Sequence, residues 1–277
     1  MNNMTIEELL VFGKSHCHSD HAKILLANLL NKNPLELLNY LDEKVDNDTV
    51  ELYKKEVLAL EGGKPLQYVI GSVNFFGNRF YVDERVLIPR FETEELVENT
   101  IKIIERNFND PLDIIDLGCG SGVIGLTLEK KISTKSVDLV DISKEALEVT
   151  KINMNNLNSK ASIIENDFLS NIDKKYDLII SNPPYIMTTE EIEEIVKENE
   201  PEIALYAGEY GLDCYKEILS KVKNNMKDKC LIAFEIGCTQ AKDIINLVHQ
   251  YLDDVKVEVK KDLSERDRML FILKNIE

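Results

Sequence analysis

A short proline-rich loop combines residue types that suit transfer of a group to nitrogen. Asn182-Pro-Pro-Tyr185 follows the predicted strand 176–181. Asn182 and Pro183 each precede a proline, which excludes helical backbone and predicts an extended, stiff loop. The Asn182 side-chain oxygen and the Pro183 main-chain oxygen can each accept one N–H of an NH2 group. Such a loop can stabilise positive charge that builds on the nitrogen and can aim it at an electrophile.

Methylation of a carboxamide is one chemistry that this loop suits. A carboxamide nitrogen is a weak nucleophile because its lone pair is delocalised into the carbonyl. No general base is required, since the surplus proton becomes acidic after transfer and can leave to water. Tyr185 can pack its ring against a planar amide and exclude water. We therefore predict Asn182, Pro183 and Tyr185 as catalytic residues, with Pro184 beside them in the substrate pocket; a plain stiffening loop is the alternative.

A glycine-rich loop lies earlier in the chain. Asp116-Leu-Gly-Cys-Gly-Ser-Gly122 comes between a predicted strand and a helix that begins near Val123. Glycines at 118, 120 and 122 allow a tight turn and a close approach of the backbone to a nucleotide. The spacing Gly120-x-Gly122-x-x-Gly125, with Asp141 about 20 residues on, also satisfies the dinucleotide-binding fingerprint.

Acidic residues favour S-adenosylmethionine over a dinucleotide. Asp116, which we predict as a cofactor-binding residue, opens the loop, Asp141 ends the next strand, and Asp167-Phe168 follows the strand after that. Each lies at the carboxyl end of a successive strand, where open α/β sheets bind ligands. We expect Asp141 to accept hydrogen bonds from ribose hydroxyls, Asp167 to accept from the adenine amino group, and Phe168 to lie against the adenine ring. The alternative is that Asp141 and Asp167 only cap the following helices.

The pattern of the chain changes near residue 90. Up to about Gly62, apolar residues recur at three- and four-residue spacing, which predicts a small helical domain. Residues 67–82 are rich in aromatic and β-branched types and predict a β-hairpin that bridges two domains. We expect a helical domain over 1–66, a hairpin linker over 67–90 and a catalytic domain over 91–277.

The region after Pro89 alternates short apolar runs with segments of helix length. This alternation predicts an α/β fold with a parallel sheet that carries helices on both faces. The predicted strands are 114–117, 137–140, 161–164, 178–180, 231–234, 255–259 and 269–273.

Composition restricts the partners. The formal net charge of −17 repels phosphate backbones, which favours a protein or small-molecule partner over nucleic acid. No basic segment followed by an apolar run lies near Met1, and no apolar run approaches the roughly 20 residues that cross a bilayer. We therefore expect a cytoplasmic protein without a membrane partner, and a monomer.

The histidines and cysteines do not indicate a metal. His16, Cys17, His18 and His21 lie close together, but their spacing is cramped for a tetrahedral site, and Ser19 is typical of a helix start. The five cysteines are odd in number and lack Cys-x-x-Cys spacing, which indicates reduced thiols.

Together these motifs resemble the release-factor-type N5-glutamine methyltransferases. The resemblance covers nearly the whole chain and includes further segments: Pro65–Tyr68, Gly71, Phe76–Gly77, Val86–Glu94, Glu200–Pro201, Ala204–Leu205, Gly208, Gly211–Leu212, Glu235–Gly237, Gln240 and Asp267–Arg268. Phe91 departs from the family, which usually has a second proline there, and Ala207 replaces a usual glycine.

The resemblance implies a Rossmann-like class I methyltransferase with a seven-stranded sheet, and S-adenosylmethionine as its cofactor. It implies that the substrate is the glutamine of the Gly-Gly-Gln loop in class 1 peptide chain release factors. By position, cofactor contacts are implied for Gly118, Cys119, Gly120, Ser121, Gly122, Asp141, Phe168 and Asn182. Arg90, Glu92, Thr93 and Glu94 are implied to shape the substrate entrance, although a helix start explains them equally well.

Three other functions stay open at this stage. An adenine-N6 methyltransferase faces the same nucleophile problem and suits the same loop, but it must grip a strand and flip a base. A non-catalytic cofactor-binding module would not need an intact Asn182-Pro-Pro-Tyr185. An NAD-dependent dehydrogenase leaves that loop unexplained.

Overall fold

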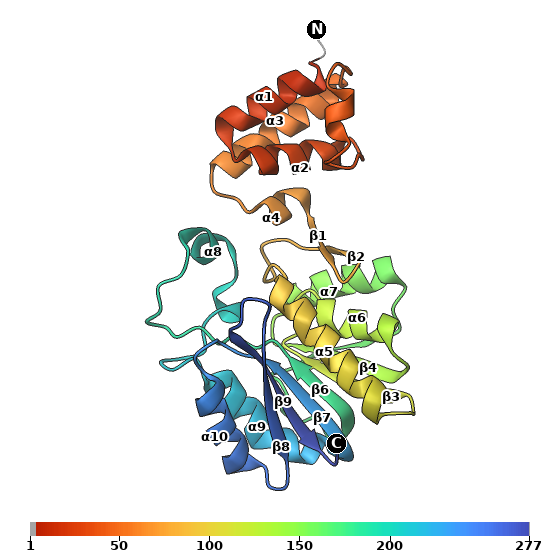
Figure 1. Cartoon of the computed structure of the whole chain (residues 1–277), viewed down its shortest axis with the longest axis vertical. Coiled ribbons are helices and arrows are strands. Elements are labelled where there is room, and N and C mark those ends of the chain that lie inside the picture. Colours follow the sequence, from red (N-terminus) through yellow and green to blue (C-terminus); the bar gives the residue numbers. More distant parts are fainter. Residues whose placement is uncertain (1–3, 277) are drawn as a thin grey trace. The chain divides into compact units, whose positions relative to one another are not determined.

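The computed structural model describes residues 4–276, which form two compact units (Figure 1). The helical unit consists of residues 4–72 together with 193–199, and the sheet unit consists of residues 73–192 and 200–276. Within residues 4–276, no helix combines the length and hydropathy that crossing a bilayer requires.

The helical unit is a small bundle. It contains α1 (Ile6–His16), α2 (Ser19–Leu29), the 3-10 helix η1 (Leu37–Tyr40), α3 (Asn47–Glu61), α4 (Leu66–Ile70) and α8 (Glu194–Asn199). Thr5 and Glu8 form a capping box at the start of α1, where each side chain bonds to the main-chain N–H of the other residue. Tyr53 is fully buried, and its hydroxyl donates to the Ala22 carbonyl at 3.3 Å. A Cβ at Gly13 would lie 2.1 Å from this hydroxyl, so only glycine lets α1 approach α3 here.

The histidines at the α1–α2 junction have structural partners. α2 begins at Ser19, as the sequence predicts, and the His18 ring caps it by accepting from the Asp20 N–H at 3.4 Å. His16 pairs with Glu61 at 3.1 Å. Over the described part of the chain, no group of three or more histidine, cysteine or acidic side chains could hold a metal ion.

The hairpin is shorter than the sequence predicts. Residues 66–70 form α4 instead, which starts after Pro65 and ends at Gly71 in the left-handed region (φ 70°). A proline at the start of a helix and a glycine at its end are the usual terminal residues, and they outweigh the β-branched composition between them. The hairpin itself joins β1 (Ser72–Phe75) to β2 (Asn78–Tyr81) through Phe76 and Gly77, both with positive φ.

The sheet unit contains a seven-stranded, mostly parallel sheet. Its strand order is β5-β4-β3-β6-β7-β9-β8, in which only β9 runs antiparallel to its neighbours. The strands are β3 (Leu112–Leu117), β4 (Thr134–Asp141), β5 (Ser162–Glu165), β6 (Tyr176–Ser181), β7 (Met226–Glu235), β8 (Lys256–Lys261) and β9 (Asp267–Lys274). All seven predicted strands are present, and the predicted fold class is confirmed. From β3 the chain first adds β4 and β5 on one side of the sheet and then crosses to add β6 and the later strands on the other side.

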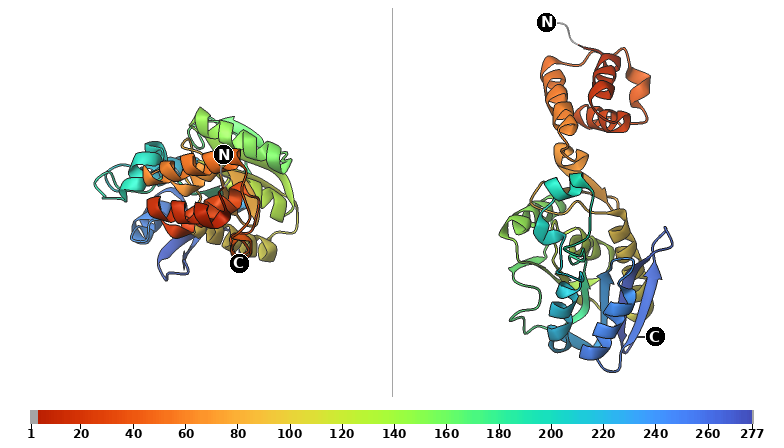
Figure 2. Two further views of the ribbon diagram at one scale, coloured as in Figure 1. Left: turned by 90° about the horizontal axis from the view of Figure 1, so that it is seen from above. Right: turned by 90° about the vertical axis from the view of Figure 1, so that its left-hand side faces the viewer.

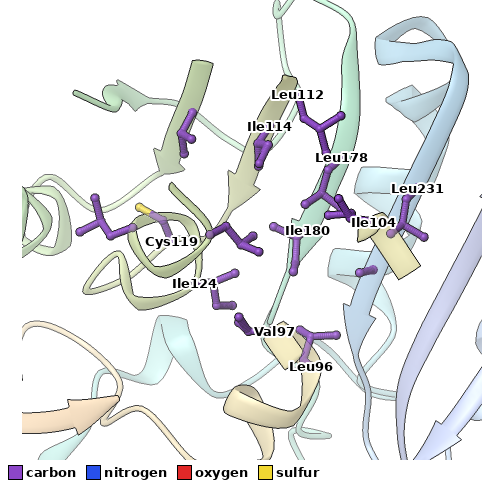
Figure 3. Packing of buried hydrophobic residues seen from close by; sticks show 14 of the residues in the cluster. Leu96, Val97, Ile104, Leu112, Ile114, Cys119, Ile124, Leu178, Ile180 and Leu231 are labelled. Carbon is purple, nitrogen blue, oxygen red and sulfur yellow. The ribbon is translucent and has the colours of Figure 1, made fainter. Parts of the chain in front are cut away.

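Helices cover both faces of this sheet. They are α5 (Phe91–Asn107), α6 (Val123–Lys131), α7 (Lys144–Leu157), α9 (Asp213–Asn225) and α10 (Ala241–Tyr251), and a 3-10 turn η2 (Glu202–Ala204) lies before α9. Alternate strand residues enter different cores: Ile114 and Ile180 pack against α5 and α6 (Figure 3), whereas Ile115 and Ile179 pack against α9 and α10. Figure 2 shows α9 and α10 beside the blue C-terminal strands. This rigid frame fixes the loops at the carboxyl ends of the strands.

Candidate active site

A cavity of about 310 Å³ opens at the carboxyl ends of the strands, where the strand order reverses. This is the position at which open α/β sheets bind ligands. The lining residues lie within segments 85–89, 118–124, 141–146, 166–168 and 201–206, together with Thr93, Asn182, Pro184 and Cys214. Gly122, a predicted cofactor residue, is not among them. Most of the predicted cofactor residues therefore meet in one place.

The glycine loop adopts a backbone that other residues rarely take. Gly118, Gly120 and Gly122 have φ values of 67°, 55° and 81°, all in the left-handed region. A Cβ at Gly122 would also lie 3.0 Å from Leu126 and 3.1 Å from Thr150. The loop thus turns sharply into α6, and Gly118 and Gly120 add no side chains to the cavity wall.

Asp141 lies at the end of β4 and lines the cavity. Its Oδ2 accepts from the Gly120 N–H at 2.8 Å, and its Oδ1 accepts from the Ser143 N–H at 2.9 Å. Each oxygen keeps a second lone pair for a ligand hydroxyl. Burial raises the pKa of Asp141. Ser143, not Asp141, caps α7 by accepting from the Ala146 N–H.

Phe168 supplies an aromatic wall. It has a φ of 45°, and the Asn166 side-chain amide donates to its carbonyl at 3.2 Å. Asp167 and Phe168 both line the cavity, and no helix follows them before β6, so Asp167 does not cap one. A main-chain cradle, a carboxylate and an aromatic wall fit a nucleoside that carries an amino acid, as in S-adenosylmethionine.

Asp116 lies behind the glycine loop and does not line the cavity. Its side chain is fully buried, and Oδ2 accepts from the Gly125 N–H at 2.8 Å, while Oδ1 has no hydrogen-bond partner among residues 4–276. Burial raises the pKa of Asp116 to about 7. A Cβ at Gly125 would lie 2.3 Å from Leu139 and 3.1 Å from this carboxylate. Asp116 therefore supports the first turn of α6 from behind.

The Asn182-Pro-Pro-Tyr185 loop leaves β6 and enters the cavity wall. Asn182 and Pro184 line the cavity, but Pro183 and Tyr185 are not part of its lining. The Asn182 Nδ2 donates to Thr93 Oγ1 at 3.2 Å. The Tyr185 hydroxyl donates to Glu235 at 3.3 Å, and burial raises the pKa of Tyr185. The tyrosine thus anchors the loop from behind.

Residues before α5 form another part of the wall. Arg90 pairs with Glu200, which is 5% exposed and also accepts from the Ile88 N–H at 2.9 Å. Neither Arg90 nor Glu92 lines the cavity, whereas Thr93 does. Glu92 lies in the first turn of α5, which agrees with the helix-start interpretation. Phe91, the departure from the family pattern, is 59% exposed.

For two buried acids, the sequence gives a place in the family pattern but no role. Glu200 holds the segment before α5, and Glu235 at the end of β7 accepts from Thr93 at 2.7 Å. Glu235 is a lone acid in an apolar stretch, a signal that indicates a buried partner but does not say which one. Glu200 stands among other acidic residues, so the sequence gives no such signal for it. The sequence likewise gives no role to the wall segment 201–206. Main-chain bonds between Ile186 and both Leu205 and Ala207 hold it in place.

Gln240 joins the proline-rich loop to the rest of the wall. Its Nε2 donates to the carbonyls of Tyr185 at 2.9 Å and Gly211 at 3.1 Å, and its Oε1 accepts from the Gly237 N–H at 3.0 Å. Gln240→Ala leaves these main-chain groups unpaired, so we expect a loss of about 1–3 kcal/mol in the free energy of unfolding. Because the loop shifts, we expect kcat to fall about tenfold.

Chemical denaturation and steady-state kinetics check this expectation. Gln250→Ala is the matched control, since Gln250 is exposed on α10. If Gln240→Ala lost stability but kept its kcat, the glutamine would support the fold without holding the loop for catalysis.

Known proteins match both parts of the chain. Residues 93–200 match the family model described as Methyltransferase small domain, and residues 18–71 match the PrmC N-terminal domain. A methyltransferase from Pyrococcus furiosus has a similar fold, with a TM-score of 0.54, 14% identity and coverage of 73% of this chain and 91% of that one. The fold, the site and the family model define an S-adenosylmethionine-dependent methyltransferase, and the predicted cofactor is confirmed.

Sequence similarity to known relatives identifies one family within this class of methyltransferases. The release factor glutamine methyltransferase of Bacillus cereus is 38% identical, over 90% of this chain and 90% of its own length. The protein of the same name from Bacillus subtilis is 36% identical, over 97% of this chain and 98% of its own length. This chain belongs to the release factor glutamine methyltransferase family, which confirms the resemblance carried by the sequence motifs.

Proposed function

We propose that this enzyme methylates the side-chain amide N5 of the glutamine in the Gly-Gly-Gln loop of class 1 peptide chain release factors. The observation that carries the proposal is the position of Asn182, which lines the cofactor cavity at the end of β6. The names of the relatives from Bacillus cereus and Bacillus subtilis support the substrate.

The chain's own groups suffice to hold a glutamine for this reaction. S-adenosylmethionine, when bound, supplies an electrophilic methyl group. Asn182 Oδ1 and the Pro183 carbonyl accept the two N–H bonds of the target amide, which fixes the direction of its lone pair and stabilises the charge that develops on nitrogen. The surplus proton leaves to water. Pro184 closes the wall beside them, and Tyr185 keeps the loop in place.

A protein substrate needs contacts beyond one glutamine. We assign this role to residues 1–66, with residues 67–90 as linker and 91–277 as the methyltransferase domain. The helical unit carries exposed apolar side chains that suit a protein partner: Val11, Leu35, Leu38, Leu52 and Leu58. Arg90, Glu92 and Thr93 belong to the substrate side of the catalytic domain. We expect a cytoplasmic monomer that contacts neither nucleic acid nor membrane, in agreement with the net charge of −17.

Mass spectrometry of a release factor incubated with the enzyme and methyl-labelled S-adenosylmethionine tests the proposal. We expect one added methyl group on the Gly-Gly-Gln glutamine, and none on a release factor in which this glutamine is changed to asparagine. A short adenine-containing duplex in a parallel reaction serves as the competing substrate. Label on adenine would replace the proposed substrate, and cofactor binding without any label would favour a non-catalytic module.

A further inference from the structure

A chain of hydrogen bonds leads from a buried carboxylate to the residue that holds the target amide. Glu235 ends β7 and is 1% exposed. Thr93, on α5 and 2% exposed, donates its hydroxyl to Glu235 Oε2 at 2.7 Å. Asn182 Nδ2 lies 3.2 Å from the same Thr93 oxygen. Glu235 does not line the cavity, and Thr93 and Asn182 connect its Oε2 to the cavity.

The donors and acceptors of this chain fix its direction. An ionised carboxylate only accepts, so Thr93 must give its single proton to Glu235. The Thr93 oxygen can then only accept from Asn182, which places the Asn182 NH2 group toward Thr93. The oxygen of a planar amide points away from its NH2 group. Among residues 4–276 the Asn182 side chain makes no other hydrogen bond, so Oδ1 is left for a ligand.

We propose that Glu235 is a positioning residue that acts through Thr93 to keep the Asn182 side-chain amide turned with its oxygen toward the target glutamine. This inference rests on the proposed function. Without these directed hydrogen bonds, the Asn182 amide can rotate by half a turn and present its NH2 group to the NH2 group of the substrate. Two donors would then face each other, and one of the two acceptors for the target amide would be lost.

The groups around Glu235 decide whether its carboxyl group is ionised, and the direction of the hydrogen bonds through Thr93 depends on that charge. Tyr185 donates to Oε1 at 3.3 Å from the proline-rich loop, and Tyr215 on α9 donates to the Glu235 main-chain carbonyl at 2.7 Å. Burial raises the pKa of Glu235 to about 7 and Glu92 on α5 adds to the rise, while Thr93, Arg268 on β9 and Tyr185 oppose it.

Protonation of Glu235 reverses the donor and acceptor roles along the Glu235–Thr93–Asn182 hydrogen bonds. A neutral Glu235 can donate to Thr93, whose hydroxyl then donates to Asn182 and turns the asparagine oxygen away from the substrate. The fraction of correctly oriented enzyme should therefore grow as the pH rises through the pKa of Glu235, which is about 7.

Paired substitutions at Thr93 test the proposal with a release factor as substrate. Thr93→Val keeps the shape but removes the hydroxyl, so we expect kcat to fall about 100-fold while KM and the cofactor Kd stay within about threefold. Thr93→Ser keeps the hydroxyl and is expected to restore kcat to within about threefold of the wild type. Equal kcat values for the two variants would overturn the inference.

The pH profile gives a second, independent measurement. Between pH 6 and 8, about one unit on either side of the pKa of Glu235, kcat of the wild type should rise, whereas kcat of Glu235→Gln should stay level. The same rise in both enzymes would overturn the inference alone. A wild-type enzyme that leaves the glutamine unmodified would overturn the proposed function and the inference with it.

Discussion

Asn182→Ala is expected to lower kcat for glutamine methylation about 10²- to 10³-fold, the usual loss when one preorganised hydrogen bond to a developing charge is removed. The substitution removes the side-chain oxygen that we assign to the target amide. It leaves the Pro183 carbonyl, which is main chain, as the remaining acceptor. Since the glycine loop and Asp141 are unchanged, we expect the cofactor Kd to change less than about tenfold.

Single-turnover kinetics with saturating cofactor and release factor measure this effect. Asn156→Ala is a matched control, because Asn156 is an exposed asparagine on α7, away from the cavity lining. If Asn182→Ala kept more than about a tenth of the wild-type kcat, the asparagine could not be the main acceptor for the amide.

The strands could be predicted from sequence because each has a strong local signal. Runs such as Leu178–Ile180 and Leu231–Phe234 are apolar throughout, as expected for strands buried on both faces. The polar loops that follow them therefore point to the ligand edge of a parallel sheet. The predicted hairpin is longer than the observed one because composition cannot distinguish a five-residue helix from a strand. There the terminal residues Pro65 and Gly71 decided the structure.

It was harder to predict the face of the sheet on which each site residue of a strand lies. Side chains alternate along a strand, so Asp116 points to the same face as Ile114, toward α6 and away from the cavity. Glu235 has the same parity as Ala233, which directs it toward α5, where it meets Thr93. This parity can be read from the sequence, but the helix residue opposite cannot, because it depends on the register of packing.

Contacts between distant segments could not be predicted at all. Arg90 and Glu200 are 110 positions apart, and Gln240 reaches the main chain of Tyr185 over 55 positions. No local period or spacing joins such residues. Only the folded sheet brings together the segments that carry them. The family pattern included all four, but a shared pattern does not say which residue touches which.

Asp141→Ala is expected to weaken S-adenosylmethionine binding about 100-fold. Hydrogen bonds to a charged acceptor contribute roughly 1.5–3 kcal/mol each, and Asp141 has one oxygen for each ribose hydroxyl. The substitution also frees the Gly120 and Ser143 N–H groups, which loosens the glycine loop. Because burial raises the pKa of Asp141, the wild-type affinity should fall as the pH is lowered and the carboxylate gains a proton.

Calorimetric titration with the cofactor measures this loss without any turnover. Asp173→Ala removes the same charge from an exposed loop position and should bind like the wild type. Asp141→Asn keeps one acceptor oxygen and should lie between wild type and alanine. A cofactor Kd for Asp141→Ala within about threefold of the Asp173→Ala value would mean that Asp141 only ties the loop. The ribose would then need another acceptor, and Asp167, the other carboxylate in the cavity lining, would be the residue to change next.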